Sequence, residues 1–359
     1  MSSNLIEQGC LFKEDLIKRL LERGCASIRY RLLTEIESQD EASTQRLAEL
    51  YKQILCDKEV SHICRQPLQQ IVSRDIHCEQ GIETYVRILK EKGVRSDNPN
   101  LLAMLEFLEE HPKAFDVGCL AKVGKYLDRL NLGGSRMITA VMFAYCGLEH
   151  LSLVRDQIEM ALKAFHYVAK IQELDEICTC FRGHAVLKKD AVWLSIYHFR
   201  LLAYTQSWRT EAQMNVVTAA IRNVLRLSPV PDLKARWKQQ IIAPGNFAIR
   251  SLEMKARNLD RSQDWMQWLH RMELLARMGV LESVAFFRDQ LADVILNVSF
   301  YERIFSSIRS HPYFIRWSPY TGMRLEESWK TRRQKEHDIL FRIVLIIHFW
   351  QVNCFTDKS

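Results

Sequence analysis

Four side chains on one predicted helix have the types and the spacing for acid–base chemistry: Met266, His270, Glu273 and Arg277. Because residues three or four apart share one side of a helix, these four form a polar stripe among apolar neighbours. If the stripe faces a cavity, His270 and Glu273 form an acid–base pair, desolvated and with shifted pKa values. The alternative is that Glu273 and Arg277 form an ion pair at i,i+4 on a packing face.

A second group of candidate residues lies near the C-terminus. Asp338 and Arg342 are four residues apart on the last predicted helix. The preceding loop adds three supporting side chains, which are Tyr320, Glu326 and Trp329. A buried Asp–Arg pair at this spacing is commonly structural, whereas a lone carboxylic acid in an aromatic pocket suits proton-initiated cyclisation. Asp264 is a further candidate acid, although its place beside Trp265 at a helix start also predicts an N-cap.

Aromatic side chains are the candidate walls of a pocket for an apolar substrate. The chain contains 8 Trp, 11 Tyr and 16 Phe, whose ring faces can stabilise cations, although ordinary packing accounts for most of them. The residues that we expect to bind substrate at a cavity are Tyr197, His198, Tyr204, Trp208, Trp268, Tyr320, Trp329 and Arg342.

One cysteine-containing segment has ligand types that zinc accepts. Cys178, Cys180 and His184 could supply two thiolates and an imidazole, with Asp175 just upstream. A matching fourth ligand is missing from the segment, and free cysteines in a helix–loop segment are the simpler interpretation. We therefore expect neither a metal nor a cofactor.

Several common enzyme signatures do not occur in the sequence. It has no Walker-type phosphate loop, no His-Glu-x-x-His helix and no Gly-x-Ser-x-Gly elbow. It also lacks the Asp-Asp-x-x-Asp pattern of magnesium-dependent terpene synthases. The common NTPase, metalloprotease and serine-hydrolase classes are therefore excluded.

A repeated unit would position the candidate residues. It consists of an apolar helix, a short glycine or charged break, and an amphipathic helix. The first helices of the six units are expected to begin near residues 27, 81, 135, 191, 264 and 337. Gly93, Gly147 and Gly279 follow helical segments. Because glycine at the C′ position ends a helix at low steric cost, these glycines predict helix–turn–helix joints.

The hydrophobic pattern separates inner from outer helices. Residues 137–144 and 341–349 are apolar nearly all round, so these helices must be covered on several sides. Their partners, such as 157–163 and 213–218, have one polar face. An open solenoid would need polar capping repeats, yet the last inner helix is among the most apolar. We therefore expect residues 1–359 to form a single all-α domain, with the hairpins closed into an (α/α)6 toroid.

Composition agrees with a large helical core in a reducing compartment. The 359 residues are 48% hydrophobic, with 13 Gly and 8 Pro spread along the chain. A signal peptide and an apolar run of bilayer length are both missing, so we expect a cytoplasmic protein. The ten cysteines are then expected to be free thiols.

The positive charge is modest and dispersed. The formal net charge of +7 arises from 50 basic and 43 acidic residues, without a concentrated basic stripe. We therefore expect no nucleic-acid partner. The block at 330–335 is expected to be a solvated helix start, and it could also favour an anionic substrate or peripheral contact with a membrane.

Four segments of the chain, 26–33, 197–210, 265–279 and 320–326, resemble bacterial proteins similar to the squalene-cyclase and prenyltransferase α/α-toroid superfamily. The resemblance implies a toroid that acts on isoprenoids. Family enzymes that begin by protonation use an Asp-x-Asp-Asp motif, which this chain lacks, and Gln80-Gly81 is only a remnant of the family's Gln-x-x-x-Gly-x-Trp repeat. The chain is about half as long as the two-domain cyclases, which implies one toroid.

The leading expectation is an enzyme that binds a hydrophobic small molecule, an isoprenoid, in a central aromatic cavity and starts carbocation chemistry with an acid. The candidate catalytic residues are Asp338, Glu273, His270 and Asp264. The alternative is a non-catalytic helical-repeat module that binds a peptide or lipid. A third hypothesis, metal-dependent prenyl transfer to a thiol, would require Cys178, Cys180 and His184 to converge. A closed apolar cavity with one buried acid is expected for the first hypothesis, and an open polar groove for the second.

Overall fold

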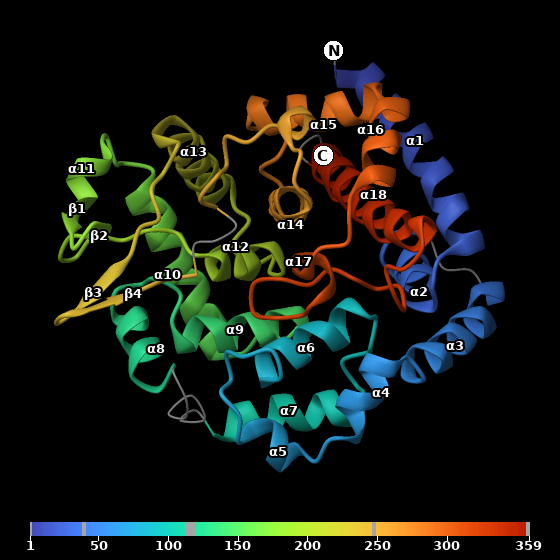
Figure 1. Ribbon diagram of the computed structural model, residues 1–359, viewed down its shortest axis with the longest axis horizontal. Coiled ribbons are helices and arrows are strands. Elements are labelled where there is room, and N and C mark those ends of the chain that lie inside the picture. The colour runs from blue at the N-terminus through green and yellow to red at the C-terminus, as the bar shows by residue number, and fades with distance from the viewer. Residues whose placement is uncertain (1, 38–40, 112–119, 246–248, 357–359) are drawn as a thin grey trace. The chain divides into compact units, whose positions relative to one another are not determined.

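The computed structural model describes residues 2–37, 41–111, 120–245 and 249–356, and these residues are mostly helical (Figure 1). Eighteen α-helices lie within the described residues, together with two small antiparallel sheets of two strands each. The expected mostly helical fold is thus confirmed. Among the described helices, none is both long and apolar enough to cross a bilayer.

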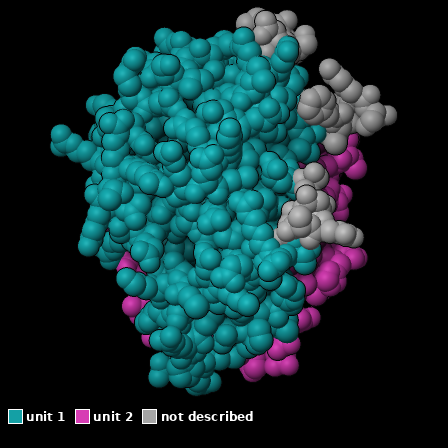
Figure 2. Space-filling view, turned by 90° about the vertical axis from the view of Figure 1, so that its right-hand side faces the viewer, with its two compact units in different colours: residues 1–71, 84–104, 256–359 teal, residues 72–83, 105–255 magenta. Residues whose placement is uncertain are grey.

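The chain divides into two compact units, which Figure 2 colours separately. Unit 1 consists of residues 1–71, 84–104 and 256–359, and unit 2 consists of residues 72–83 and 105–255. The division passes through helices α6 (Ile82–Glu91) and α7 (Pro99–Glu110), so each of these helices contributes residues to both units.

Unit 1 is built around the long helix α18 (Arg332–Thr356), which packs against α1 (Ser2–Arg23), α14 (Ser262–Arg277) and α16 (Val298–Ser307). The stretch 339–347 of α18 is buried on every side, because its apolar residues leave no face for water. The other helices of this unit are α2 (Ala26–Glu35), α3 (Glu41–Leu55), α4 (Lys58–Arg65), α5 (Leu68–Val72), whose last residue falls in unit 2, α15 (Ala285–Leu296), α17 (Pro312–Ile315) and the 3-10 helix η2 (Ala256–Asn258).

Unit 2 is built around α9 (Ser135–Tyr145), which packs against α8 (Leu120–Arg129), α10 (Ser152–Val168) and α12 (Ile196–Ala203). Residues 137–144 of α9 are buried, as their all-round apolar pattern predicts. Helix α13 (Glu211–Leu227) packs on the amphipathic α10, and the short α11 (Leu174–Ile177) leads into the first sheet.

The first sheet stands where the sequence suggested a helix–loop segment, so that expectation was wrong. Strand β1 (Cys178–Phe181) pairs with β2 (His184–Leu187). The two residues between them, Arg182 and Gly183, both have positive φ, at 51° and 76°, as a tight hairpin turn requires. The second hairpin joins β3 (Ala235–Trp237) to β4 (Gln240–Ile242).

The predicted glycine joints are confirmed at Gly93, Gly147 and Gly279, whose φ angles are 89°, 77° and 78°. At each joint the amide of the next residue bonds to a carbonyl five residues earlier; at the first, the amide of Val94 donates to Leu89 over 2.8 Å. This is the Schellman pattern, which satisfies carbonyl groups at the helix end and needs a residue in the left-handed region.

The first helices of the predicted units begin at or within a few residues of the expected positions, as α2, α6, α9, α12, α14 and α18. The two largest shifts have local causes. Helix α12 begins only after Ser195, whose extended backbone forms the N-cap. Helix α18 begins early because Thr331 Oγ1 accepts the amide of Gln334 over 3.2 Å and thus caps the charged first turn.

Candidate functional site

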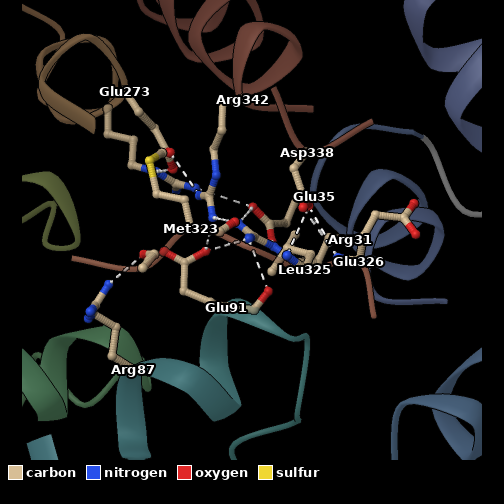
Figure 3. Close-up of polar contacts among 12 residues, drawn as sticks. Arg31, Glu35, Arg87, Glu91, Glu273, Met323, Leu325, Glu326, Asp338 and Arg342 are labelled. Atoms are coloured by element: carbon tan, nitrogen blue, oxygen red, sulfur yellow. Dashed lines mark hydrogen bonds and ion pairs between the residues drawn. The ribbon is translucent and has the colours of Figure 1, made fainter. Parts of the chain in front are cut away.

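Six charged side chains, four of them buried and two partly exposed, form an Arg–Glu network in unit 1 (Figure 3). The network contains three arginines and three glutamates from α2, α6, α14 and α18, so its formal charges cancel; its members are Arg31, Glu35, Glu91, Glu273, Arg277 and Arg342. Because buried charges are tolerated only when they are paired, this balance is what allows four helices to direct charged groups into one interior.

Glu273 lies between two guanidinium groups of this network. Its Oε1 accepts from Arg277 Nε over 3.0 Å, and its Oε2 accepts from Arg342 Nη1 over 2.9 Å. The i,i+4 ion pair, given above as the alternative to an acid–base pair with His270, is therefore present. His270 is half-buried on the same helix, and its predicted catalytic role stays a prediction.

Two carboxylates of the network, Glu35 and Glu91, are held in their ionised form. Burial alone would raise the pKa of Glu35, but Arg31 and Arg277 outweigh burial and lower this pKa to about 2. The pKa of Glu91 is likewise lowered, against the effect of burial, by Arg342 and Arg31. Ionised carboxylates that are clamped in this way have no proton to donate near neutral pH.

Asp338 occupies a separate buried position in unit 1 and is 2% exposed. Its carboxylate accepts from the amide of Leu325 over 2.9 Å and from the indole Nε1 of Trp329 over 2.6 Å. Burial raises the pKa of Asp338 to about 6, while the donated hydrogen bonds act in the opposite direction. Asp338 thus joins α18 to the loop before it.

The suggested pair of Asp338 with Arg342 was wrong, because each group has better partners. Arg342 bonds to Glu273 and, through Nη2, to Glu91 over 2.9 Å, whereas loop donors satisfy Asp338. The loop residue Glu326 accepts from the amide of Cys25 over 3.1 Å and lies 2.7 Å from His337 Nδ1.

The remaining predicted residues of unit 1 lie in packing or turn positions. Asp264 is not the N-cap of α14, because Arg261 takes that position and pairs with Asp264 over 2.7 Å. Trp268 is buried and donates its indole proton to Gln290 over 2.9 Å. Tyr320 lies in a turn, where its amide donates to Ser318 Oγ over 3.3 Å.

In unit 2, Tyr197 belongs to a buried cluster that the sequence did not suggest. Its hydroxyl donates to Glu83 Oε1 over 2.7 Å, and His77 Nδ1 lies 2.7 Å from the other oxygen of Glu83. Arg200 adds a positive charge 3.7 Å from Glu83. More than a hundred positions separate Tyr197 from Glu83, so no local spacing pattern connects the two residues.

His198, Tyr204 and Trp208 are also engaged within unit 2. The Nδ1 of His198 accepts the amide of Ser195 over 2.8 Å, and burial lowers the pKa of His198 to about 3, so the ring is neutral. Tyr204 packs edge-on against Tyr145, with ring centroids 4.5 Å apart. The indole of Trp208 donates to the Leu202 carbonyl over 3.0 Å.

The hairpin register separates the proposed zinc ligands. Cys178 and Cys180 are two residues apart on β1, so their side chains share one face of the hairpin. His184 pairs with Phe181 and therefore shares the opposite face. Among the described residues, no group of three or more His, Cys, Asp or Glu side chains is placed to hold a metal ion.

Unit 2 contains a cavity of about 520 Å³, a candidate site that the sequence pattern did not indicate. Leu108, Phe143, Leu151 and Leu153 form its apolar walls. Glu109, Lys125, Arg136 and Ser152 are exposed and form its rim. The polar groups deeper in the cavity are Asp128, Ser135 and Thr139.

Ser135 and Asp128 lie together at the start of α9. Both carboxylate oxygens of Asp128 accept the amide of Arg136, each over 3.2 Å. Burial raises the pKa of Asp128 to about 6, although these amide bonds oppose the rise. Ser135 is 5% exposed, and its Oγ has no hydrogen-bond partner among the described residues. A buried hydroxyl without a partner is uncommon in folded proteins.

Glycine packing brings α8 against the start of α9. A Cβ on Gly124 would lie 1.9 Å from Ser135 Oγ, and a Cβ on Gly134 would lie 2.1 Å from the Gly124 carbonyl oxygen. With serine at position 135, a residue without a side chain is therefore required at both positions. In the sequence, the pair Gly133-Gly134 before Ser135 was the one available signal of this close approach.

A cavity of about 380 Å³ in unit 1 has a different character. Four of its five charged lining residues form pairs: Arg19 with Glu302 over 2.5 Å, and Arg332 with Glu336 over 2.8 Å. Because these four charges already have partners, they are less available to bind a ligand, and the lining is more polar than that of the unit 2 cavity.

Comparisons of the chain with protein-family models, with curated proteins and with solved structures find no match. The arrangement of this chain's own side chains is therefore the basis for a functional proposal.

Proposed function

We propose that the chain is a helical-repeat binding protein whose ligand is a small, mainly apolar, lipid-like molecule held in the cavity of unit 2. The observation that carries this proposal is the cavity itself, with a volume of about 520 Å³ and walls of leucine and phenylalanine. Pockets for small ligands have volumes of roughly 300–1,000 Å³, mainly apolar linings and a few placed polar groups.

The ion pairs formed by two of the predicted catalytic acids also favour binding over catalysis. Glu273 is clamped by Arg277 and Arg342, and Asp264 is paired with Arg261. The proposal requires no metal and no cofactor. As parts of the same hypothesis, we propose that the six hairpins close into a ring and that the chain is distantly related to the α/α-toroid superfamily. We also propose that the protein is cytoplasmic, with reduced thiols.

The proposal is tested by co-purification. The wild-type chain is incubated with a mixture of medium-chain alkanes, alcohols, acids and amines, repurified, and its bound molecules are identified by mass spectrometry. Leu153→Trp fills the cavity wall, while Leu102→Trp places the same side chain at an exposed position on α7. We expect retained ligand in the wild type and in Leu102→Trp, and its loss in Leu153→Trp. Equal retention in all three proteins would refute the proposal.

Acid-initiated isoprenoid chemistry is a second candidate, and Asp338 is the specific reason to keep it. This carboxyl is buried beside the Trp329 ring, and burial raises its pKa to about 6, so a protonated fraction exists near neutral pH. Expression in a host that supplies prenyl diphosphates and squalene, followed by gas chromatography with mass detection, tests it. A new product that Asp338→Asn abolishes would support this candidate, and no product from the folded wild type would remove it.

A further inference from the structure

We propose that single-stranded nucleic acid binds to a basic surface of unit 2, around the turn of the hairpin between β3 and β4. This surface, which we call the hairpin surface, consists of four basic and two aromatic side chains; its members are Tyr126, Arg129, Arg182, Arg236, Trp237 and Lys238. None of the six lines the cavity of unit 2. The inference therefore goes beyond the proposed ligand binding and does not depend on it.

Three segments of unit 2 meet at the turn between β3 and β4, and Figure 1 shows α8 next to these strands. From the first hairpin, Arg182 Nη1 donates to the Gln239 carbonyl oxygen over 3.3 Å. From α8, the Tyr126 hydroxyl donates to the Arg236 carbonyl oxygen. The Tyr126 ring also stacks on Trp237, with centroids 5.8 Å apart and planes at 25°. The fold thus gathers basic residues that are dispersed in the sequence, where they predicted no nucleic-acid partner.

The basic members of the hairpin surface have no acidic partners. All four are exposed, and the ion pairs among the described residues of unit 2 use other cations. Four positive charges are therefore open to solvent without being neutralised. Because arginine presents its N–H donors in a planar fork, three of these side chains suit the paired oxygens of a phosphate group.

Aromatic rings hold the arginines in place. The guanidinium carbon of Arg236 lies 4.0 Å from the centroid of the Phe181 ring, and that of Arg182 lies 5.2 Å from the same centroid. Arg129 lies over the Tyr126 ring at 5.5 Å. A contact with a ring face positions a guanidinium group without neutralising its charge. The arginines are thus ordered in advance for binding an anion.

Both hairpin turns begin with a basic residue in the left-handed region. The φ angle of Arg182 is 51°, and that of Lys238 is 56°. Glycine or asparagine adopts this conformation at lower cost than a long side chain does. The backbone therefore does not account for a cation at either turn, whereas a ligand that carries negative charge does.

The geometry favours a flexible strand as the partner. Arg236 and Trp237 are successive residues of β3, so their side chains point to opposite faces of the hairpin. A single strand that passes over the turn can contact both faces. Its phosphates then meet the arginines, and a base stacks on the Trp237 ring, which is partly exposed. A rigid duplex reaches one face at a time.

An anionic membrane is the main competitor, because it also attracts basic side chains. Insertion into a bilayer needs exposed apolar side chains. Among the described residues, the large apolar side chains that are exposed lie on neither hairpin and not on α8. The hairpin surface therefore offers a bilayer charge alone, whereas it offers nucleic acid both charge and stacking.

Fluorescence anisotropy tests the inference with the full chain and two labelled probes, oligothymidylate and oligouridylate of about 12 nucleotides. We expect both to bind, and a duplex of the same length to bind more weakly. The logarithm of the binding constant should fall with the logarithm of the salt concentration with a slope of about −3. This slope follows from four cations, because each neutralised phosphate of a single strand contributes about −0.7.

Two variants and a control locate the site. Trp237→Leu keeps every charge and should weaken binding about 5- to 100-fold, as the loss of one stacked base predicts. Arg236→Gln should weaken binding about five- to tenfold and make the salt slope shallower by about 0.7. Arg155→Gln removes the same charge from an exposed position of α10, and it should change binding by less than about twofold.

Lys238→Asn separates binding from folding. Asparagine adopts a positive φ more readily than lysine does, so this variant should unfold at a higher temperature than the wild type while it binds both probes more weakly. Weaker binding by a more stable variant does not result from a failure to fold. Thermal unfolding is measured for every variant.

Several outcomes would overturn the inference. They are no binding of either probe, a duplex that binds as tightly as the single strands, and a folded Trp237→Leu that binds as the wild type does. Equal losses in Arg155→Gln and Arg236→Gln would also overturn it, because the net charge of the chain would then be the cause. Vesicles with about 30% phosphatidylserine in phosphatidylcholine are titrated in parallel. Vesicle binding that Arg236→Gln abolishes, without binding of either probe, would assign the hairpin surface to a membrane instead.

Discussion

Arg342 Nη1 donates a hydrogen bond to Glu273 Oε2 over 2.9 Å and thereby joins α18 to α14 within unit 1. Both side chains are almost completely buried, at 2% and 3% exposure. Removing one member of a buried ion pair leaves an uncompensated charge, which costs about 3–5 kcal/mol. The pair is therefore a requirement for the stability of unit 1, even though it adds little to stability compared with an apolar pair.

Glu273→Gln is expected to lower the free energy of unfolding by about 3 kcal/mol or more, because Arg277 and Arg342 would each lose a charged partner. Urea unfolding followed by circular dichroism measures the change. Glu14→Gln, at an exposed position of α1, is the matched control and should have little effect. Equal stability of the two variants would show that the network is not needed.

A double variant tests whether Glu273 and Arg342 act as a pair. Glu273→Gln combined with Arg342→Gln should cost less than the sum of the two single substitutions, since neither charge is then left without the other. The same urea experiment gives the coupling energy. Strict additivity would mean that each residue stabilises unit 1 independently.

Asp338 should make stability depend on pH. Its pKa is raised from 3.8 to about 6 in the folded chain, so the folded state binds the proton more tightly than the unfolded state does. The resulting stabilisation is fully present below the unfolded pKa and is lost as the pH rises through the folded pKa. The free energy of unfolding of the wild type, measured relative to that of Asp338→Asn, should therefore fall by roughly 2–3 kcal/mol between about pH 4 and about pH 7.5. A difference that does not change with pH would contradict the raised pKa.

The glycine packing at the cavity predicts a specific rescue. Gly124→Ala should destabilise unit 2, because the new Cβ would lie 1.9 Å from Ser135 Oγ. In the Ser135→Ala background the nearest side-chain atom is the Ser135 Cβ position at 3.2 Å, so the same substitution should be tolerated much better. Thermal unfolding of the two single variants and the double variant measures this. Equal losses in both backgrounds would mean that α8 and α9 do not pack as described.

Ser135→Ala alone should raise the melting temperature of the ligand-free chain, because it removes a buried hydroxyl that has no partner among the described residues. A lower melting temperature would indicate that Ser135 Oγ has a structural partner.

The helical framework could be predicted because its signals are local. The all-round apolar stretches of α9 and α18 require burial, and Gly93, Gly147 and Gly279 end helices through their own backbone conformation. The first hairpin was missed because four-residue strands carry little periodicity, and the turn residues Arg182 and Gly183 were the one cue.

The Arg–Glu network and the unit 2 cavity could not be predicted, because both bring together residues that are distant in the sequence. Glu91 and Arg342 are 251 positions apart. The spacing of Glu273 and Arg277 predicted one ion pair, but it did not indicate that Arg342 of α18 would also bind the Glu273 carboxylate. The cavity likewise combines residues from α7, α8, α9 and the start of α10. None of these residues stood out alone, whereas the conspicuous aromatic residues proved to be engaged in packing and in buried hydrogen bonds.

The most direct test of the binding function is a crystal structure of the chain soaked with 8-bromo-1-octanol, in which anomalous scattering locates the bromine atom. The account predicts a bromine peak inside the cavity, near Phe143, Leu151 and Leu153, and no peak there in Leu153→Trp. A cavity of the wild type that stays free of bromine, with peaks confined to other parts of the molecule, would contradict the proposed function.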